Sequence, residues 1–123
     1  MATKTFHVAA DWKFIFTAAD SVDLTGAPAW ALECNIRLRG SDSPQITKVS
    51  GVDPGTTAIN ESTRKNEVFI PNEDTVLLEK GSYYVDLWRT DDGSTAPLYG
   101  PTLILVKGTA KVRGTGEDTE ELN

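Results

Sequence analysis

Two side chains of this sequence could act in catalysis, His7 as a general base and Cys34 as a nucleophile. A catalytic cysteine needs a nearby base, and the single histidine lies far from the single cysteine along the chain. Phe6 and Val8 flank His7, while Cys34 stands in a segment of alternating polarity. We therefore predict a strand or surface histidine and a buried free thiol that behaves like a small apolar side chain. An internal disulfide is excluded, and an intermolecular disulfide or a reactive thiol is the open alternative for Cys34.

Paired acidic residues could bind calcium, which needs several converging oxygen ligands. The pairs are Asp20 with Asp23, Glu73 with Asp74, and Asp91 with Asp92. No ordered series of further oxygen ligands accompanies them, so we predict turn capping without a metal. The stretches 51–57 and 108–111 do not match a phosphate-binding loop, and the sequence implies no cofactor. A glycosidase carboxylate pair stays open, although so small a domain is not expected to form a deep cleft.

Aromatic side chains are the candidates for a binding surface, because Trp and Tyr join a large apolar area to a polar group and concentrate at binding hot spots. The interface candidates are Tyr84, Trp88, Tyr99 and Trp12. Tyr84 and Trp88 lead this set, because both fall on the outward register of one predicted strand. Trp30 alternates with Leu32 and Ile36 and fits a core position better. Core packing is the simpler interpretation of these rings in general.

The strand that positions Tyr84 and Trp88 is the clearest element of the sequence. After the turn residue Gly81, the sequence alternates between inward positions, which are Tyr83, Val85 and Leu87, and outward positions between them. A tyrosine at the start of such a strand often packs inward while its hydroxyl bonds to the upstream backbone, which is the tyrosine corner of Greek-key sandwiches. We predict this structural corner at Gly81 and Tyr83, with Asp86 on the outward face.

Short alternating segments and frequent turn residues predict an all-β fold, an immunoglobulin-like antiparallel β-sandwich of about seven to nine strands. Strands are expected on either side of residues 10–11, and at 29–39, 46–52, 82–89 and 98–112, with a bend at Gly100-Pro101. We expect a loop or a short helical turn at residues 60–66. At residues 72–74 we expect one turn of helix or the end of an edge strand. Residues 1–113 form the expected domain, with an N-terminal arm of about residues 1–10, and residues 114–123 an acidic, flexible tail.

Composition excludes several classes of partner. The formal charge is −6, and the twelve basic residues are scattered along the chain, whereas nucleic-acid binding needs clustered Lys and Arg. No apolar run approaches the length of a membrane span, and the N-terminus lacks the apolar core of a signal peptide. We expect a protein that is made soluble inside a cell and binds neither nucleic acid nor membrane.

The order of these features resembles a family of viral proteins. The turn 22–27 (Val-Asp-Leu-Thr-Gly-Ala), the corner 81–87 (Gly-Ser-Tyr-Tyr-Val-Asp-Leu) and the Asp-Gly hairpin at 92–93 are similar to immunoglobulin-like N-terminal modules of tailed-phage baseplate upper proteins and related tail or neck proteins. The resemblance spans roughly residues 14–112 and carries no catalytic residue.

This resemblance implies a non-enzymatic structural subunit of a phage virion, made in the host cytoplasm. Such a subunit would assemble as a symmetric homo-oligomer and dock to other virion proteins through aromatic and edge-strand surfaces. The tail, baseplate, neck or collar, and capsid-decoration layers stay open. The alternative function is a carbohydrate-binding module, in which Trp88, Tyr84 and Tyr99 stack on sugar rings.

Overall fold

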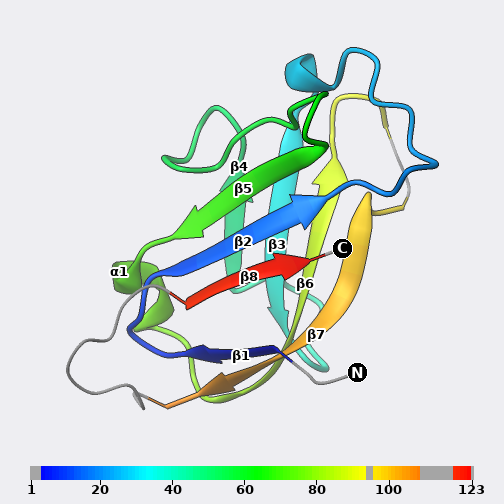
Figure 1. Ribbon diagram of the computed structural model, residues 1–123. Coiled ribbons are helices and arrows are strands. Elements are labelled where there is room, and N and C mark those ends of the chain that lie inside the picture. Colours follow the sequence, from blue (N-terminus) through cyan, green and yellow to red (C-terminus); the bar gives the residue numbers. More distant parts are fainter. Residues whose placement is uncertain (1–3, 94–95, 109–117, 123) are drawn as a thin grey trace.

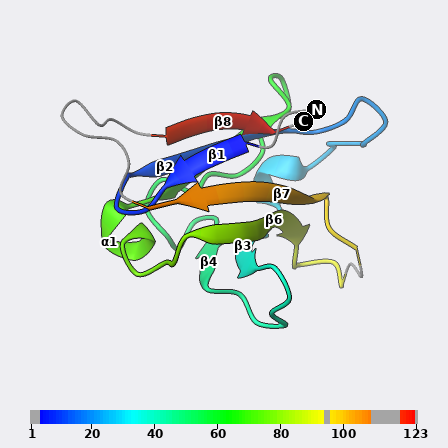
Figure 2. The same cartoon turned by 90° about the horizontal axis from the view of Figure 1, so that it is seen from below.

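The computed structural model of the chain describes residues 4–93, 96–108 and 118–122. Within them the fold is all-β, with two sheets packed face to face (Figures 1 and 2). The larger sheet has the strand order β1-β7-β6-β3-β4, with bounds Lys4–His7, Tyr99–Lys107, Gly81–Arg89, Leu32–Leu38 and Ile46–Val49. The smaller sheet has the order β5-β2-β8, with bounds Lys65–Ile70, Trp12–Thr17 and Asp118–Leu122.

Alternating apolar residues build the core between the two sheets. In β2, every second residue from Trp12 to Phe16 is buried, and the residues between them are partly exposed. Phe6 of β1 lies across from this strand, with ring centroids 5.1 Å from Trp12 and 4.9 Å from Phe14. From the larger sheet, Val85 and Ile104 complete this layer at 0% exposure. Strands with one buried face are what a two-layer β fold requires.

The corner before β6 has the geometry of a tyrosine corner. The side chain of Tyr83 is buried, and its hydroxyl donates a 2.7 Å hydrogen bond to the carbonyl oxygen of Glu79. Gly81 has a φ of 153°, which lies in the region that favours glycine. The corner therefore joins the short helix α1 (Asn72–Thr75) to the central strand of the larger sheet.

A bend distorts the pairing of β6 with β7. The register shifts between Val85 and Leu87, opposite the Gly100-Pro101 dipeptide. Gly100 has a φ of 84°, and a Cβ atom there would lie 2.6 Å from the carbonyl oxygen of Val85. Only glycine fits this close backbone approach.

Residues of the expected acidic tail belong to the fold, which corrects the predicted division of the chain. Asp118–Leu122 form β8, which pairs in parallel with β2 from Trp12 to Phe16. Pairing uses backbone N–H and C=O groups, so an acidic composition does not prevent a segment from completing a sheet. Residues 114–117 and 123 lie outside the described part of the chain.

The described residues of the expected N-terminal arm contain the strand predicted ahead of residues 10–11. Lys4–His7 form β1, which pairs in parallel with the end of β7, and Phe6 is fully buried. The two parallel pairs, β1 with β7 and β2 with β8, make both sheets mixed rather than purely antiparallel.

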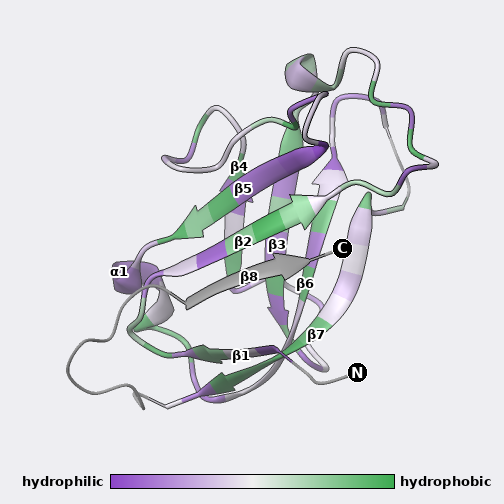
Figure 3. Cartoon of the chain, viewed as in Figure 1, coloured by the Kyte–Doolittle hydropathy of each residue, from purple (hydrophilic) through white to green (hydrophobic). Residues whose placement is uncertain are grey.

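The polar stretch after residue 59 contains β5 as its second half. Figure 3 shows why the alternation is hard to see in the sequence: the first half of β5 is hydrophilic and the second half apolar. Asn66 is nevertheless buried, along with Val68 and Ile70. These three positions share the core-facing side of the strand, because they alternate along it. A 3-10 turn at Ala27–Ala29 lies in the connection from β2 to β3.

Candidate interface surfaces

The outer face of β3 and β6 carries two of the aromatic candidates. We call this surface the outer β3–β6 face and define it by Glu33, Asn35, Arg37, Tyr84, Asp86 and Trp88. These residues are directly paired across the two strands, Glu33 with Trp88, Asn35 with Asp86, and Arg37 with Tyr84. Directly opposed side chains on one face of an antiparallel pair lie in contact range, so alternation alone gathers them into one surface.

Asp86 lies at the centre of this face and is only 6% exposed. Its Oδ1 atom accepts a 3.0 Å hydrogen bond from Nε1 of Trp88, and its carboxylate also bonds to the Asn35 side chain. Burial raises the pKa of Asp86, while the bond from Trp88 and the positive charge of Arg37 act in the opposite direction. The expected outward register of Asp86 is present, but its neighbours cover the carboxylate.

The two aromatic rings of the outer β3–β6 face are half-buried and held in place. The Trp88 indole is fixed by its bond to Asp86, and the Arg37 guanidinium lies 5.9 Å from the centroid of the Tyr84 ring. Beside Trp88 is a shallow depression of about 280 Å³, lined by Glu33, Asn35, Arg37, Pro44, Asp86 and Trp88. A fixed Trp beside polar groups can bind a partner at little cost in side-chain entropy.

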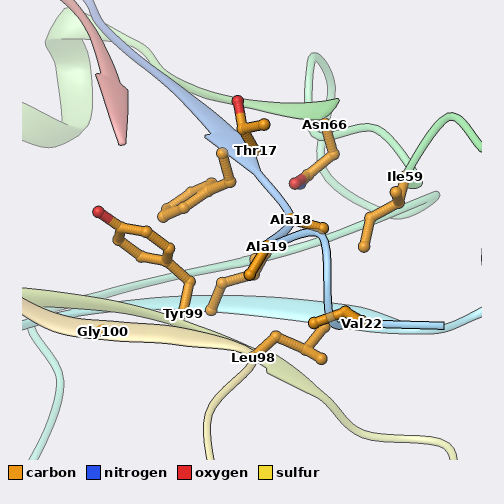
Figure 4. A pocket seen from close by; sticks show the side chains of 11 residues that line it. Thr17, Ala18, Ala19, Val22, Ile59, Asn66, Leu98, Tyr99 and Gly100 are labelled. Carbon is orange, nitrogen blue, oxygen red and sulfur yellow. The ribbon is translucent and has the colours of Figure 1, made fainter. Parts of the chain in front are cut away.

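Tyr99 lies elsewhere, at the end of the sandwich. Its ring packs edge-on against Phe16 with centroids 5.1 Å apart, and it lines a second hollow that we call the end pocket (Figure 4). The lining of the end pocket is Phe16, Thr17, Ala18, Ala19, Val22, Ile59, Asn66, Leu87, Leu98, Tyr99 and Gly100. Tyr99 therefore does not join Tyr84 and Trp88 in one platform.

Trp12 belongs to the core rather than to a surface, which corrects its place among the interface candidates. The side chain has 0% exposure, and its Nε1 donates a 2.8 Å hydrogen bond to the carbonyl oxygen of His7. The reason is the alternation of β2, since Trp12 shares its face with Phe14 and Phe16. Trp30 is half-buried, and its ring lies 4.0 Å from the Arg89 guanidinium carbon.

An exposed apolar pair beside β4 was not recognised in the sequence. Val76 and Leu77, which follow α1, are 53% and 81% exposed. A 2.7 Å ion pair between Lys48 of β4 and Asp74 holds α1 against the edge of the larger sheet. We call Val76, Leu77 and the adjoining strand β4 the α1–β4 surface. The sequence signal was ambiguous, because Leu77 and Leu78 are both apolar and only Leu78 is buried.

The cysteine and the acidic residues considered for catalysis or metal binding are buried or bonded to neighbouring protein groups. Cys34 is buried, and burial, together with the charges of Asp86 and Glu33, raises the pKa of its thiol. Asp23 accepts hydrogen bonds from the backbone N–H and the hydroxyl of Thr25, and Asp91 from the Arg89 guanidinium. Across the described residues, no group of three or more His, Cys, Asp or Glu side chains is placed to hold a metal ion.

Among the helices in the described part of the chain, none has the length and apolar character needed to cross a membrane.

Comparisons with known proteins do not assign the chain to a family. No protein-family model, no curated protein and no solved structure matches the chain.

Proposed function

We propose that this chain is a non-enzymatic structural subunit of a tailed-phage virion, which self-associates and docks to other virion proteins. The observation that carries the proposal is the Trp88 side chain, which the buried Asp86 carboxylate holds on the outer β3–β6 face beside Tyr84 and Arg37. Tyr, Trp and Arg are the residue types enriched at interface hot spots. The layer of the virion stays open among tail, baseplate, neck or collar, and capsid decoration.

We further propose that the sandwich is immunoglobulin-like. The order β7-β6-β3-β4 facing β5-β2 has the neighbours expected of strands G, F, C and C′ facing E and B in such domains. The hydrogen bond from Tyr83 to Glu79 at the start of β6 supports this assignment, because that corner belongs to strand F. β1 and β8 are additions at the edges of this arrangement.

The α1–β4 surface is the second contact region in the proposal. β4 is the last strand of the larger sheet, and an edge strand can pair with another chain through its backbone groups. Leu77 shares a hollow with residues 45–48 and adds exposed apolar area beside that edge, and Val76, the residue before it, is also exposed. This surface adjoins the outer β3–β6 face, because the Thr47 hydroxyl of β4 donates a 2.7 Å hydrogen bond to the Asn35 side chain. A contact through the β4 edge that meets a different surface of the next copy is heterologous, and heterologous contacts repeat into rings or filaments.

Light scattering over a concentration series tests self-association. The wild-type chain should form a discrete oligomer, and Trp88→Ala and Tyr84→Ala should each weaken association while the domain stays folded by circular dichroism. Val52→Ala is the matched control, because Val52 is 75% exposed and lies outside the outer β3–β6 face. A wild-type monomer at every concentration, or variants that assemble as the wild type does, would contradict the proposal.

A carbohydrate-binding module is the second candidate. The depression beside Trp88 favours it, since an aromatic ring flanked by amide and carboxylate groups can stack on a sugar and bond to its hydroxyls. Tyr99 does not take part, because it lines the end pocket. Titration with soluble oligosaccharides should then give a saturable change in tryptophan fluorescence that is lost in Trp88→Phe, whereas a change retained in Trp88→Phe would contradict this site.

A further inference from the structure

The end pocket is a second, chemically distinct hollow that the proposed function does not use. Its volume is about 180 Å³, and apolar groups from β2, β6, β7 and their loops dominate its walls. No residue of the lining carries a charged side chain. The lining therefore suits an uncharged ligand better than an ion, because the lining side chains offer no charge to replace an ion's hydration.

Small side chains create the space. β2 ends at Thr17, and the next two residues, Ala18 and Ala19, present only methyl groups to the hollow (Figure 4). Across from them, Leu98 and Tyr99 form the opposite side, and in Figure 4 the Tyr99 hydroxyl points away from Leu98 and Val22. The pocket is open where larger residues in place of the two alanines would have filled it.

Arg64 holds the pocket wall in position. Its guanidinium donates hydrogen bonds of 2.6 Å and 2.7 Å to the carbonyl oxygens of Ala19 and Val22. In addition, the backbone N–H of Ala18 donates a 2.8 Å bond to the carbonyl oxygen of Arg64. The loop after β2 is thus tied by three hydrogen bonds to Arg64, the residue before β5, and the pocket is pre-formed, as binding pockets usually are.

The size of the pocket limits what it can hold. Sites for drug-sized ligands occupy roughly 300–1,000 Å³, so the end pocket, which is open to solvent at Ala19 and Gly100, can hold only a small group. An apolar cavity of about 150 Å³ in another protein is large enough to bind benzene. The end pocket therefore matches a single small ring.

Asn66 supplies one polar group to this apolar space. The side chain is 2% exposed, its Nδ2 donates to the carbonyl oxygen of Thr57 at 3.4 Å, and Figure 4 shows its amide directed into the pocket. A buried amide gains from a ligand hydroxyl that can pair with it. We propose that the end pocket binds small uncharged aromatic alcohols of the phenol class, with the ring among the apolar side chains and the hydroxyl at Asn66.

The test is a titration of the full chain with p-cresol, followed by NMR amide shifts and by thermal unfolding. Saturable shifts should occur at Ala18, Ala19 and Leu98, and the unfolding midpoint should rise with ligand concentration, because a ligand that binds only the folded state stabilises it. Ala18→Leu and Ala19→Leu, each of which fills the space, should weaken binding at least about tenfold. Using two such variants keeps the test valid if one does not fold.

Ala29→Leu is the matched control, because Ala29 is exposed and lies outside the pocket, and it should bind p-cresol as the wild type does. p-Xylene, of similar size but without a hydroxyl, should bind more weakly than p-cresol, since it offers no hydrogen bond to the Asn66 amide. Absence of saturable shifts, or undiminished binding by a folded Ala18→Leu or Ala19→Leu variant, would overturn the proposal. Equal binding of p-xylene and p-cresol would overturn the role given to Asn66.

Discussion

Asp86 and Trp88, two residues apart on β6, are joined by a 3.0 Å hydrogen bond from the indole Nε1 to the carboxylate Oδ1. Residues i and i+2 of a strand share a face, so the bond holds the indole Nε1 beside the Asp86 carboxylate on the strand's outer surface. The arrangement ties Trp88, a candidate interface residue, to a carboxyl group whose ionisation is disfavoured by burial. The protonation of Asp86 therefore affects both the stability of the fold and the position of the Trp88 side chain.

Asp86→Asn should change how stability depends on pH. Burial raises the pKa of Asp86 above its ordinary value of 3.8, so between the two values the folded state binds the proton more strongly than the unfolded state does. The cost of the buried charge is absent below the unfolded-state pKa and fully present above the raised pKa. Denaturant unfolding at a series of pH values should show the variant gaining stability relative to the wild type as pH rises through this window.

Asp91→Asn should show the opposite trend and serves as a comparison. The hydrogen bond from Arg89 lowers the pKa of Asp91, so this residue contributes stability above its unfolded-state pKa that is lost as pH falls through the folded-state value. The variant should be less stable than the wild type near neutral pH and approach it in acid. A parallel response of the two variants to pH would contradict both assignments.

Tyr83→Phe should destabilise the fold by about 1 kcal/mol, because it removes the hydroxyl and leaves the Glu79 carbonyl without its 2.7 Å bond. Tyr84→Phe is the matched control on the next residue, where the ring is half-exposed on the outer β3–β6 face. Urea unfolding of both variants checks the expectation. Equal losses at the two positions would remove the special role of the corner.

Gly100→Ala should cost about 3 kcal/mol or more in unfolding free energy, since the methyl group meets the Val85 carbonyl oxygen at 2.6 Å and the φ of 84° is strained for alanine. Gly51→Ala has a comparable φ of 75° with no described atom within 4 Å of the new methyl group. It should cost only about 1 kcal/mol. Thermal unfolding should measure both losses of stability. Their difference gives the cost of the clash between the new methyl group and the Val85 carbonyl oxygen.

Cys34 should react with a thiol reagent only when the protein opens. The side chain is 1% exposed, and its raised pKa keeps the reactive thiolate scarce. Labelling with a disulfide reagent should be slow in buffer and fast in denaturant. Rapid labelling of the native protein would show that β3 opens locally.

Local patterns in the sequence were sufficient for some of these features. The turn at Gly81 and the alternation after Tyr83 predict β6 and its inward and outward faces, because a strand's side-chain direction depends only on its own backbone. Other features depend on distant residues. Asp86 is on the predicted face, yet it is only 6% exposed and bonds to Asn35 of the neighbouring strand β3, a contact that the pattern of β6 alone does not contain.

The remaining differences have the same non-local origin. β8 is not predicted from the sequence, because its segment is acidic and its partner β2 lies near the other end of the chain. The end pocket results from Ala18, Leu98 and Asn66, which the topology brings together from three separate segments. Trp12 is different, because its alternation with Phe14 and Phe16 in the sequence is sufficient on its own to predict a core position.

The pairing of the outermost strands has a consequence for how the chain folds. Lys4 of β1 pairs with Ile104, and Trp12 of β2 pairs with Asp118, so the first strand in sequence order pairs with one nearly the length of the domain away. Contacts of such long sequence separation slow folding, because the loop-closure entropy must be lost before the contacts form. Until β7 is in place, β1 has no strand to pair with on the larger sheet, and the Phe6 side chain is left open to contacts with other unfinished chains.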